Sequence, residues 1–223
     1  MTSWINRHTL IAAVVAAFVM YIFVTSIQKN RLYELELLTR AQVAEQETVL
    51  ATIAEVTARN GADAVTESVI RDCTQTERSS FDSLLGRLDA GLSTTELSDL
   101  ERLFGRCGRF YAERKSVMVA RLEREIEVYA SLIAQASVVA GRDQSEAFQL
   151  PAWQNLSELE SRQSELFTEL VNIQDEIIST LLTGGASQQE TLANIKAAAK
   201  EVQENLALVN TQAAAVRAEL LPL

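Results

Sequence analysis

The sequence has few of the residues that interrupt helices. It contains two prolines and eight glycines among its 223 residues. Proline removes a backbone donor and kinks a helix, and glycine has a low helix propensity. Aromatic residues make up only 6% of the chain, and no segment shows the sustained period-two alternation of a β-strand. These absences argue against sheets and predict an all-α protein.

Residues that carry common side-chain chemistry are also scarce. His8 is the only histidine and has no acid or nucleophile beside it in the sequence, which argues against a catalytic triad. One histidine and two cysteines give too few ligands for a zinc site. Cys73 and Cys107 lack the CxxC spacing of a thioredoxin-like centre. We therefore expect a non-enzymatic protein with no catalytic residue, no metal and no cofactor.

Positive charge is too sparse for sequence-independent nucleic-acid binding, which needs many cationic contacts with phosphates. The formal net charge is -10. Arg7 is the only charged side chain before Lys29, so the chain after its first segment is strongly acidic. We expect no nucleic-acid partner.

The longest apolar run is uninterrupted from Leu10 to Ile27. With one residue added at each end, it has about the length that a helix needs to cross a bilayer. A signal peptide has a shorter core and a cleavage site of small residues, and Val24, Thr25 and Ser26 match such a site poorly. We therefore predict that residues 1–28 are an uncleaved membrane anchor, with the lipid bilayer as partner through Leu10–Ile27.

Residues 29–140 are predicted to form a stalk and then a cysteine-containing helical hairpin. Two polar residues lie within the apolar stripe of the stalk, as polar positions in helix seams do when they fix register. The apolar stripe is Leu35, Leu38, Val49, Ile53 and Val56, and the polar positions within it are Gln42 and Gln46. The segment 60–63, Asn-Gly-Ala-Asp, is a predicted break.

The hairpin has a first arm from Thr66 to Leu88 and a second arm that begins at Ser93. Ser93 and Glu96 have the spacing of a capping box. Folding the chain about the turn between the arms places Cys73 opposite Cys107 and predicts a disulfide. The alternative is a reduced pair that packs as small hydrophobic residues. The stripe of the second arm is Leu97, Leu100, Phe104, Cys107, Tyr111, Met118, Leu122, Ile126, Tyr129, Ile133 and Ala136.

Residues 141–151 are predicted to be a linker, and residues 152–223 a C-terminal antiparallel coiled-coil hairpin. Pro151 suits the first turn of a helix. Gly184 and Gly185 supply the turn, and Ser187 with Glu190 forms a second capping box. The two seams are Leu156, Leu159, Gln163, Leu166, Leu170, Ile173 and Ile177, and then Leu192, Ile195, Ala199, Val202, Leu206, Val209, Ala213, Val216 and Leu220.

One stripe of the second arm carries a basic patch. Arg102, Arg106 and Arg109 are spaced to lie on the same helix face. Guanidinium groups are well shaped for carboxylates, so one hypothesis is an anion-binding site. The other interpretation is surface pairing with acidic residues on the same and neighbouring helices, which is the usual role of such alternating charge.

Two arguments about orientation disagree. Lys29, Arg31 and Arg40 follow the anchor, which favours a cytoplasmic body by the positive-inside rule. The predicted disulfide favours an oxidising compartment. We favour a single-pass membrane protein with an extracytoplasmic, periplasmic body, and the cytoplasmic orientation stays open.

An up-down-up-down bundle that rises from a membrane helix resembles, in helix order and not in motifs, the sensing region of bacterial chemoreceptors. The sequence shows no second hydrophobic span. We expect a membrane-anchored, non-enzymatic helical scaffold or accessory subunit that binds a protein partner or itself, as a homo-oligomer, through coiled-coil surfaces. The alternative is an extracytoplasmic ligand sensor that acts through a separate membrane partner.

Overall fold

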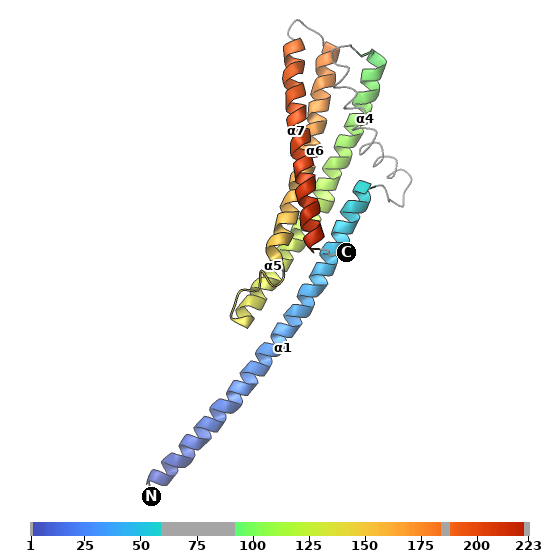
Figure 1. Ribbon diagram of the computed structural model, residues 1–223. Helices are drawn as coiled ribbons and strands as arrows, with labels where there is room; N and C mark the ends of the chain where they lie inside the picture. Colours follow the sequence, from blue (N-terminus) through green and yellow to red (C-terminus); the bar gives the residue numbers. More distant parts are fainter. Residues whose placement is uncertain (1, 59–91, 184–187, 221–223) are drawn as a thin grey trace. The chain divides into compact units, whose positions relative to one another are not determined.

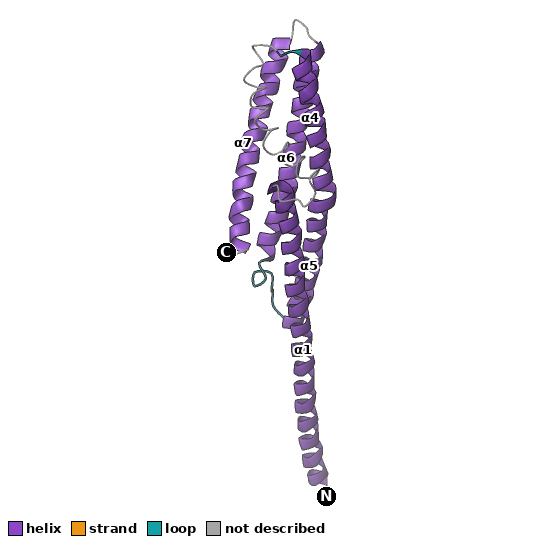
Figure 2. Ribbon diagram, turned by 90° about the vertical axis from the view of Figure 1, so that its right-hand side faces the viewer, coloured by secondary structure: helices purple, strands orange, loops and turns teal. Residues whose placement is uncertain are grey.

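The computed structural model describes residues 2–58, 92–183 and 188–220, and in these ranges all regular structure is helical (Figures 1 and 2). The all-α prediction is confirmed for the described residues. The elements are α1 (Thr2–Ala58), α4 (Thr94–Glu113), the π-helix η2 (Arg114–Val119), α5 (Ala120–Ala140), α6 (Leu150–Thr183) and α7 (Gln188–Leu220).

The chain divides into two compact units, which are described separately. The first unit comprises Met1–Ala44 and Glu127–Leu150, and the second comprises Glu45–Ile126 and Pro151–Leu223. Several predicted features lie outside the described residues. These are the break at 60–63, the first hairpin arm with Cys73, the turn at 184–185 and the cap at Ser187.

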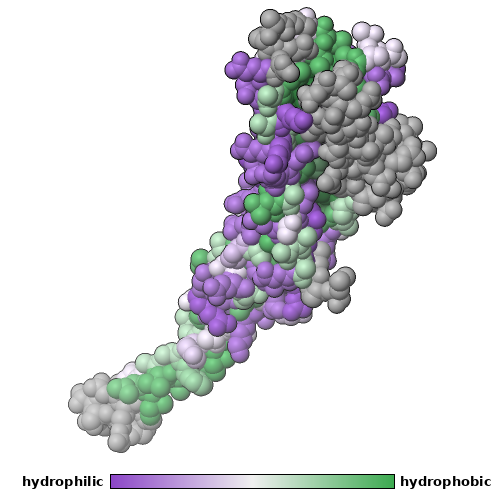
Figure 3. Space-filling model, turned by 45° about the horizontal axis from the view of Figure 1, so that its top comes forward, coloured by the Kyte–Doolittle hydropathy of each residue, from purple (hydrophilic) through white to green (hydrophobic). Residues whose placement is uncertain are grey.

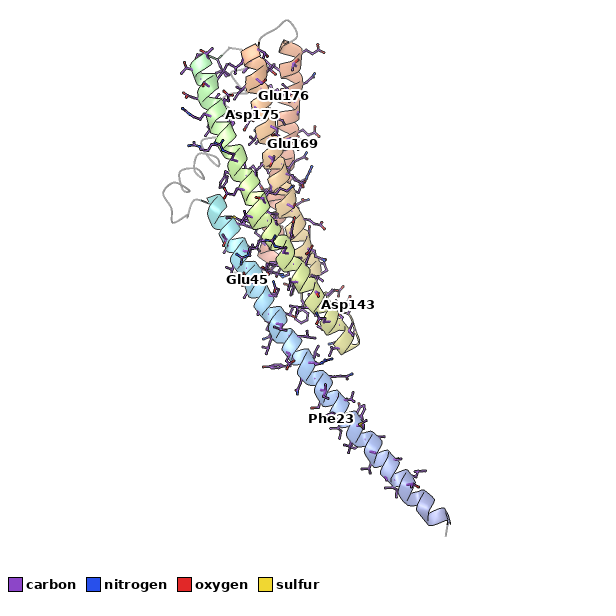
Figure 4. All side chains as sticks on the ribbon, turned by 180° about the vertical axis from the view of Figure 1, so that it is seen from behind. Phe23, Glu45, Asp143, Glu169, Asp175 and Glu176 are labelled. Carbon is purple, nitrogen blue, oxygen red and sulfur yellow. The ribbon has the colours of Figure 1, made fainter. Side chains whose placement is uncertain are left out.

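In the first unit, the N-terminal half of α1 carries an apolar and exposed surface. The side chains from Leu10 to Ile27 are exposed or, at Thr25, half-buried, and Phe23 projects with 63% of its surface accessible (Figure 4). Figure 3 shows hydrophobic side chains gathered on the visible face of this segment. In the described ranges α1 is the one helix long and apolar enough to cross a membrane, which is consistent with a single-pass anchor or a signal sequence.

The packed face of the stalk differs from the predicted stripe by one residue. Leu38 was expected on the packed stripe, but it is 54% exposed, and Thr39 is fully buried instead. The Thr39 hydroxyl donates to the carbonyl of Leu35 at 2.6 Å, so it is buried without losing a hydrogen bond. The polar Thr39 therefore occupies the packed position that the pattern of apolar residues assigned to Leu38.

The chain leaves regular helix between the end of α5 at Ala140 and the start of α6 at Leu150. Gly141 adopts a left-handed φ of 66°, and its N–H donates to Val138 while that of Arg142 donates to Ser137. This pair of bonds is a Schellman motif, which ends α5 and favours glycine at this position. Helix α6 then begins at Leu150, so Pro151 lies in its first turn as predicted.

The second unit is built on α4, α6 and α7, which lie side by side with α6 and α7 antiparallel (Figures 1 and 2). All the predicted seam positions of α6 and α7 are buried or half-buried. The capping box of α4 is also confirmed, because the Glu96 N–H donates to Ser93 Oγ at 3.3 Å and the Ser93 N–H donates to Glu96 Oε2 at 2.9 Å. The main core comprises Leu97, Phe104, Leu166, Leu170, Ile173, Ile177, Ile178, Ile195, Ala199, Val202 and Val209.

The C-terminal part of α1 also enters this unit. Val49, Leu50 and Ile53 are buried, and Arg121 of α5 donates to the carboxylate of Glu45. Gln46, predicted as a polar seam position, is fully buried. Helix α1 is therefore exposed and apolar near its beginning and part of a packed core near its end.

Helices α4 and α6 approach each other closely at Gly108. A Cβ atom at this position would lie 2.9 Å from Cγ1 of the buried Val171. One turn further along α4, Tyr111 stacks on Phe167 with ring centroids 4.4 Å apart. At Gly105, on the same helix, no atom of the described residues beyond the local helix lies within 4 Å of the equivalent position.

We predict opposite effects for alanine at these two glycines. Gly108→Ala should lower the free energy of unfolding by about 1–3 kcal/mol, because Val171 or a helix backbone must move. Gly105→Ala should raise it by about 0.5–1 kcal/mol through helix propensity alone. Urea denaturation of both variants beside the parent chain measures the two effects, and a stabilising Gly108→Ala would contradict this packing.

Candidate functional site

A π-helical turn interrupts the long helix that the sequence predicts from Ser93 to Ala140. The N–H of Ala120 donates to the carbonyl of Lys115, five residues earlier, which inserts one extra residue into the turn. The buried stripe consequently passes to Val119, which is 1% exposed, and the predicted seam residue Met118 is only half-buried. The predicted seam residue was thus wrong by one position, Met118 in place of Val119, because regular α-helical spacing was assumed across the turn.

The π-turn begins at a buried arginine. Arg114 is 3% exposed. Its Nη2 donates to Glu160 Oε2 at 2.8 Å and to Gln163 Oε1 at 2.9 Å. Its Nη1 donates to the hydroxyl of the fully buried Ser164. Three side chains within little more than one turn of α6 thus contact one guanidinium group.

The network continues from α6 to α7. Glu160 is fully buried, and its Oε1 accepts a hydrogen bond from Arg217 Nη2. The side-chain amide of Gln163 donates to Asn210 Oδ1. We call Arg114, Glu160, Gln163, Ser164 and Arg217 the polar network. It joins η2, α6 and α7 through hydrogen bonds to charged groups, which are stronger than those between neutral groups.

Burial changes the electrostatics of the network. Desolvation lowers the pKa of Arg114 to about 10, so its guanidinium remains charged at neutral pH. The pKa of Arg217 is also lowered, by burial first and then by the neighbouring charge of Arg114. Glu160 is the carboxylate shared by these two cations. Because both of its oxygens accept from guanidinium groups, the arrangement suits a structural clamp more than proton transfer.

Arg114 was not singled out from the sequence, and this network was not predicted. A signal for it was present in the spacing. Arg114 follows Tyr111 by three residues, and Glu160 follows Leu156 by four, so both charges occupy seam positions of their helices. Opposite charges at seam positions of two helices that pack together predict a buried pair.

The predicted anion-binding arginines remain together on α4. Arg102 is exposed and donates to Asp99 at 2.7 Å on the same helix, Arg106 is half-buried and Arg109 is exposed. The Asp99 contact fits the surface-pairing interpretation for Arg102, and the anion-site hypothesis stays a prediction.

Cys107 is fully buried, and its predicted disulfide partner Cys73 lies outside the described residues, so the bridge also stays a prediction.

Two shallow, open grooves of about 570 and 590 Å³ lie between the η2–α5 segment and α6. Both are lined by Glu123 and Glu165. Lys115 donates to Glu165 at 3.0 Å, and this bond lowers the pKa of Glu165. Desolvation partly opposes the shift, and a second hydrogen bond from Arg162 adds to it. No group of three or more metal-binding side chains is found in the part of the chain that the structure describes.

The fold and the site together define a class: a helical bundle with a buried polar network and one candidate N-terminal membrane helix. A scan against protein-family models, a search of curated proteins and a search of solved structures each find no match to this chain.

We predict a large effect for removing the buried cation. Arg114→Met should lower the free energy of unfolding by about 3–5 kcal/mol, because Glu160, Gln163 and Ser164 lose a buried donor. The matched control is Arg102→Ala, which removes an exposed ion pair and should cost less than about 1 kcal/mol. Denaturant titrations of both variants supply the comparison, and similar small effects for the two would show that the Arg114 contacts contribute little.

We predict a pH-dependent gain from Asp175→Asn on α6 (Figure 4). Partial desolvation, and then the charge of Glu101, raises the pKa of Asp175. The folded state therefore holds this proton more tightly than the unfolded chain, and the charged carboxylate lowers stability above the raised pKa. Asp175→Asn should raise the melting temperature at pH 7, and the gain should shrink as the pH falls through the raised pKa towards 3.8. A gain that is equal at pH 7 and pH 4 would contradict this assignment.

Proposed function

We propose that the protein is a membrane-anchored, non-enzymatic helical scaffold or accessory subunit. It binds a protein partner or a second copy of itself through coiled-coil surfaces. The observation that carries the proposal is the continuity of α1 from Thr2 to Ala58. A single helix contains both the exposed apolar run from Leu10 to Ile27 and the residues from Val49 to Ile53 that pack in the second unit. The apolar run and these core residues thus belong to one continuous helix without a connecting loop.

The surface of the body supports a role in protein binding. Leu182 of α6 and Leu208 of α7 are 50% and 56% exposed, outside the seam that the two helices share. The hydrophobic effect favours covering such side chains. Buried side chains from both helices occupy the seam that they share, so the proposal places binding on their outer faces.

The proposal includes the finer features predicted from the sequence. Residues 29–140 contribute a cysteine-containing hairpin, and residues 152–223 contribute the second coiled-coil hairpin. A Cys73–Cys107 disulfide would require an oxidising compartment, which places the body on the periplasmic side. Quantitative thiol labelling of native and of denatured, reduced protein tests the bridge, since a bridged protein is labelled only after reduction.

We predict that the full-length chain stays in membranes after alkaline extraction and that affinity capture in mild detergent recovers a partner or a second copy. Leu208→Glu should reduce the amount recovered, because it places a charge on an apolar contact surface. Asn205→Glu, at another exposed position of α7, is the matched control and should recover as much as the parent chain.

Two results would contradict the proposal at different points. A mature protein that begins after Ser26 and is soluble without detergent would show that the apolar run is a signal sequence and not an anchor. An anchored chain that recovers no partner and no second copy, but is stabilised against heat by a small ligand, would favour the sensor, because a ligand that binds only the folded state raises stability.

A further inference from the structure

In the first unit, α1 has an exposed face opposite its packed face. Thr39 is fully buried and Leu35 is half-buried, whereas Tyr33 and Leu37 are 62% and 49% exposed. Leu37 lies about 160° around the helix axis from Thr39, since successive residues of an α-helix are about 100° apart. Tyr33 and Leu37 are therefore on the side of α1 away from Thr39.

This face continues into the membrane segment as a regular heptad seam. Consecutive members are four and three residues apart, as in the a and d positions of a coiled coil. All of them are exposed. We call this set the α1 seam: Val19, Phe23, Ser26, Asn30, Tyr33 and Leu37. It passes from the apolar run into the stalk without a change of register.

Two polar features of the α1 seam match a second, parallel copy of the same helix. Asn30 occupies an a position, where a single asparagine in a parallel coiled coil fixes register by pairing with its counterpart. Lys29 then falls at g and Glu34 at e of the next heptad, and both are exposed. In a parallel pair, g of one helix faces the following e of the other, so each Lys29 meets the partner's Glu34.

Membrane insertion supplies the parallel orientation. Two copies of this chain cross the bilayer in the same direction and at the same depth. Their Asn30 residues are then at one height just beyond the apolar run, and Tyr33 and Leu37 of each face those of the other. The seam ends at the next d position, Arg40, whose guanidinium is paired with Glu36 of its own helix at 2.6 Å.

We infer that α1 forms a parallel homodimer with a second copy of this chain through the α1 seam. The contact runs from the end of the apolar run into the first turns of the stalk. This inference deepens the proposed function by naming one partner of the scaffold and the surface that binds it. Within the bilayer Ala12 and Ala16 continue the seam and allow close helix approach. Outside the bilayer, burial of Tyr33 and Leu37 adds a hydrophobic contribution.

The first test is cysteine crosslinking in membranes that contain two differently tagged copies of the full-length chain. Asn30→Cys, Tyr33→Cys and Leu37→Cys should each give a disulfide-linked product that carries both tags. Arg31→Cys and Leu35→Cys, off the seam, should give several-fold less and match the parent chain with its native cysteines. Equal crosslinking at all five positions, none at any, or a product that joins one copy to a different protein would overturn the inference.

The second test exchanges charges between copies. Lys29→Glu and Glu34→Lys each place like charges at both g–e contacts of a homodimer, which should lower self-capture several-fold. Co-expressed, the two variants restore both attractive contacts, so mixed dimers should exceed either homodimer. If the fraction of mixed dimers is no higher than random association gives, the assigned register is wrong. Failure in both tests would exclude the α1 homodimer. Membrane anchoring and partner binding by the body are tested separately, by alkaline extraction and affinity capture.

Discussion

The body depends on one buried ion pair. Arg114 and Glu160 lose their hydration when η2 packs against α6, and the cost of that loss is offset only if nearly every donor and acceptor finds a partner. Glu160 binds two guanidinium groups, and the Nη atoms of Arg114 bind a carboxylate, an amide and a hydroxyl, while Arg114 Nε is buried without a partner among the described residues. Because these partners come from three elements, the register of η2 against α6 and of α6 against α7 is specified at the same point.

The π-turn and this ion pair belong together. Arg114 faces α6 at a regular spacing of three residues from Tyr111, and the extra residue in η2 then moves the next inward position to Val119, from which the stripe continues through Leu122. A regular α-helix through the same sequence would turn Met118 inward and Val119 outward. The turn thus changes which residue follows Arg114 on the packed face, and the hydrophobic seam continues on either side of it.

Helix α1 has a different function in each unit. Near its beginning it has no packed neighbours among the described elements and exposes apolar side chains, and near its end it contributes core residues to the body. In between, one face carries Thr39 and the opposite face carries Tyr33 and Leu37. A helix with two such faces can pack within its own chain and with a second helix simultaneously, which is the arrangement expected of a scaffold that is anchored and assembled by one element.

The sequence predicted much of this fold, because helix faces follow from the spacing of apolar residues. The seams of α6 and α7, the capping box at Ser93 and the proline at the start of α6 were all predictable from local chemistry. Two errors have different causes. Thr39 replaced Leu38 because its hydroxyl bonds to its own helix, and Val119 replaced Met118 because the helix changes its hydrogen-bond spacing at η2.

The polar network was missed for a third reason. No interior position was predicted for Arg114, although its place on the stripe indicated one. Such pairs can be found from sequence only if charged residues at seam positions are matched between helices that pack together. The anion-binding hypothesis for Arg102, Arg106 and Arg109 and the Cys73–Cys107 bridge stay predictions.

The measurement that tests the central claim most directly is a double-mutant cycle between Arg114 and Glu160. It uses Arg114→Met, Glu160→Leu and the double variant, with unfolding followed by urea denaturation. If the buried pair sets the register of the body, the double variant should be much less destabilised than the sum of the single variants, with a coupling energy of about 2–3 kcal/mol. Single effects that add to within about 0.5 kcal/mol would contradict the account.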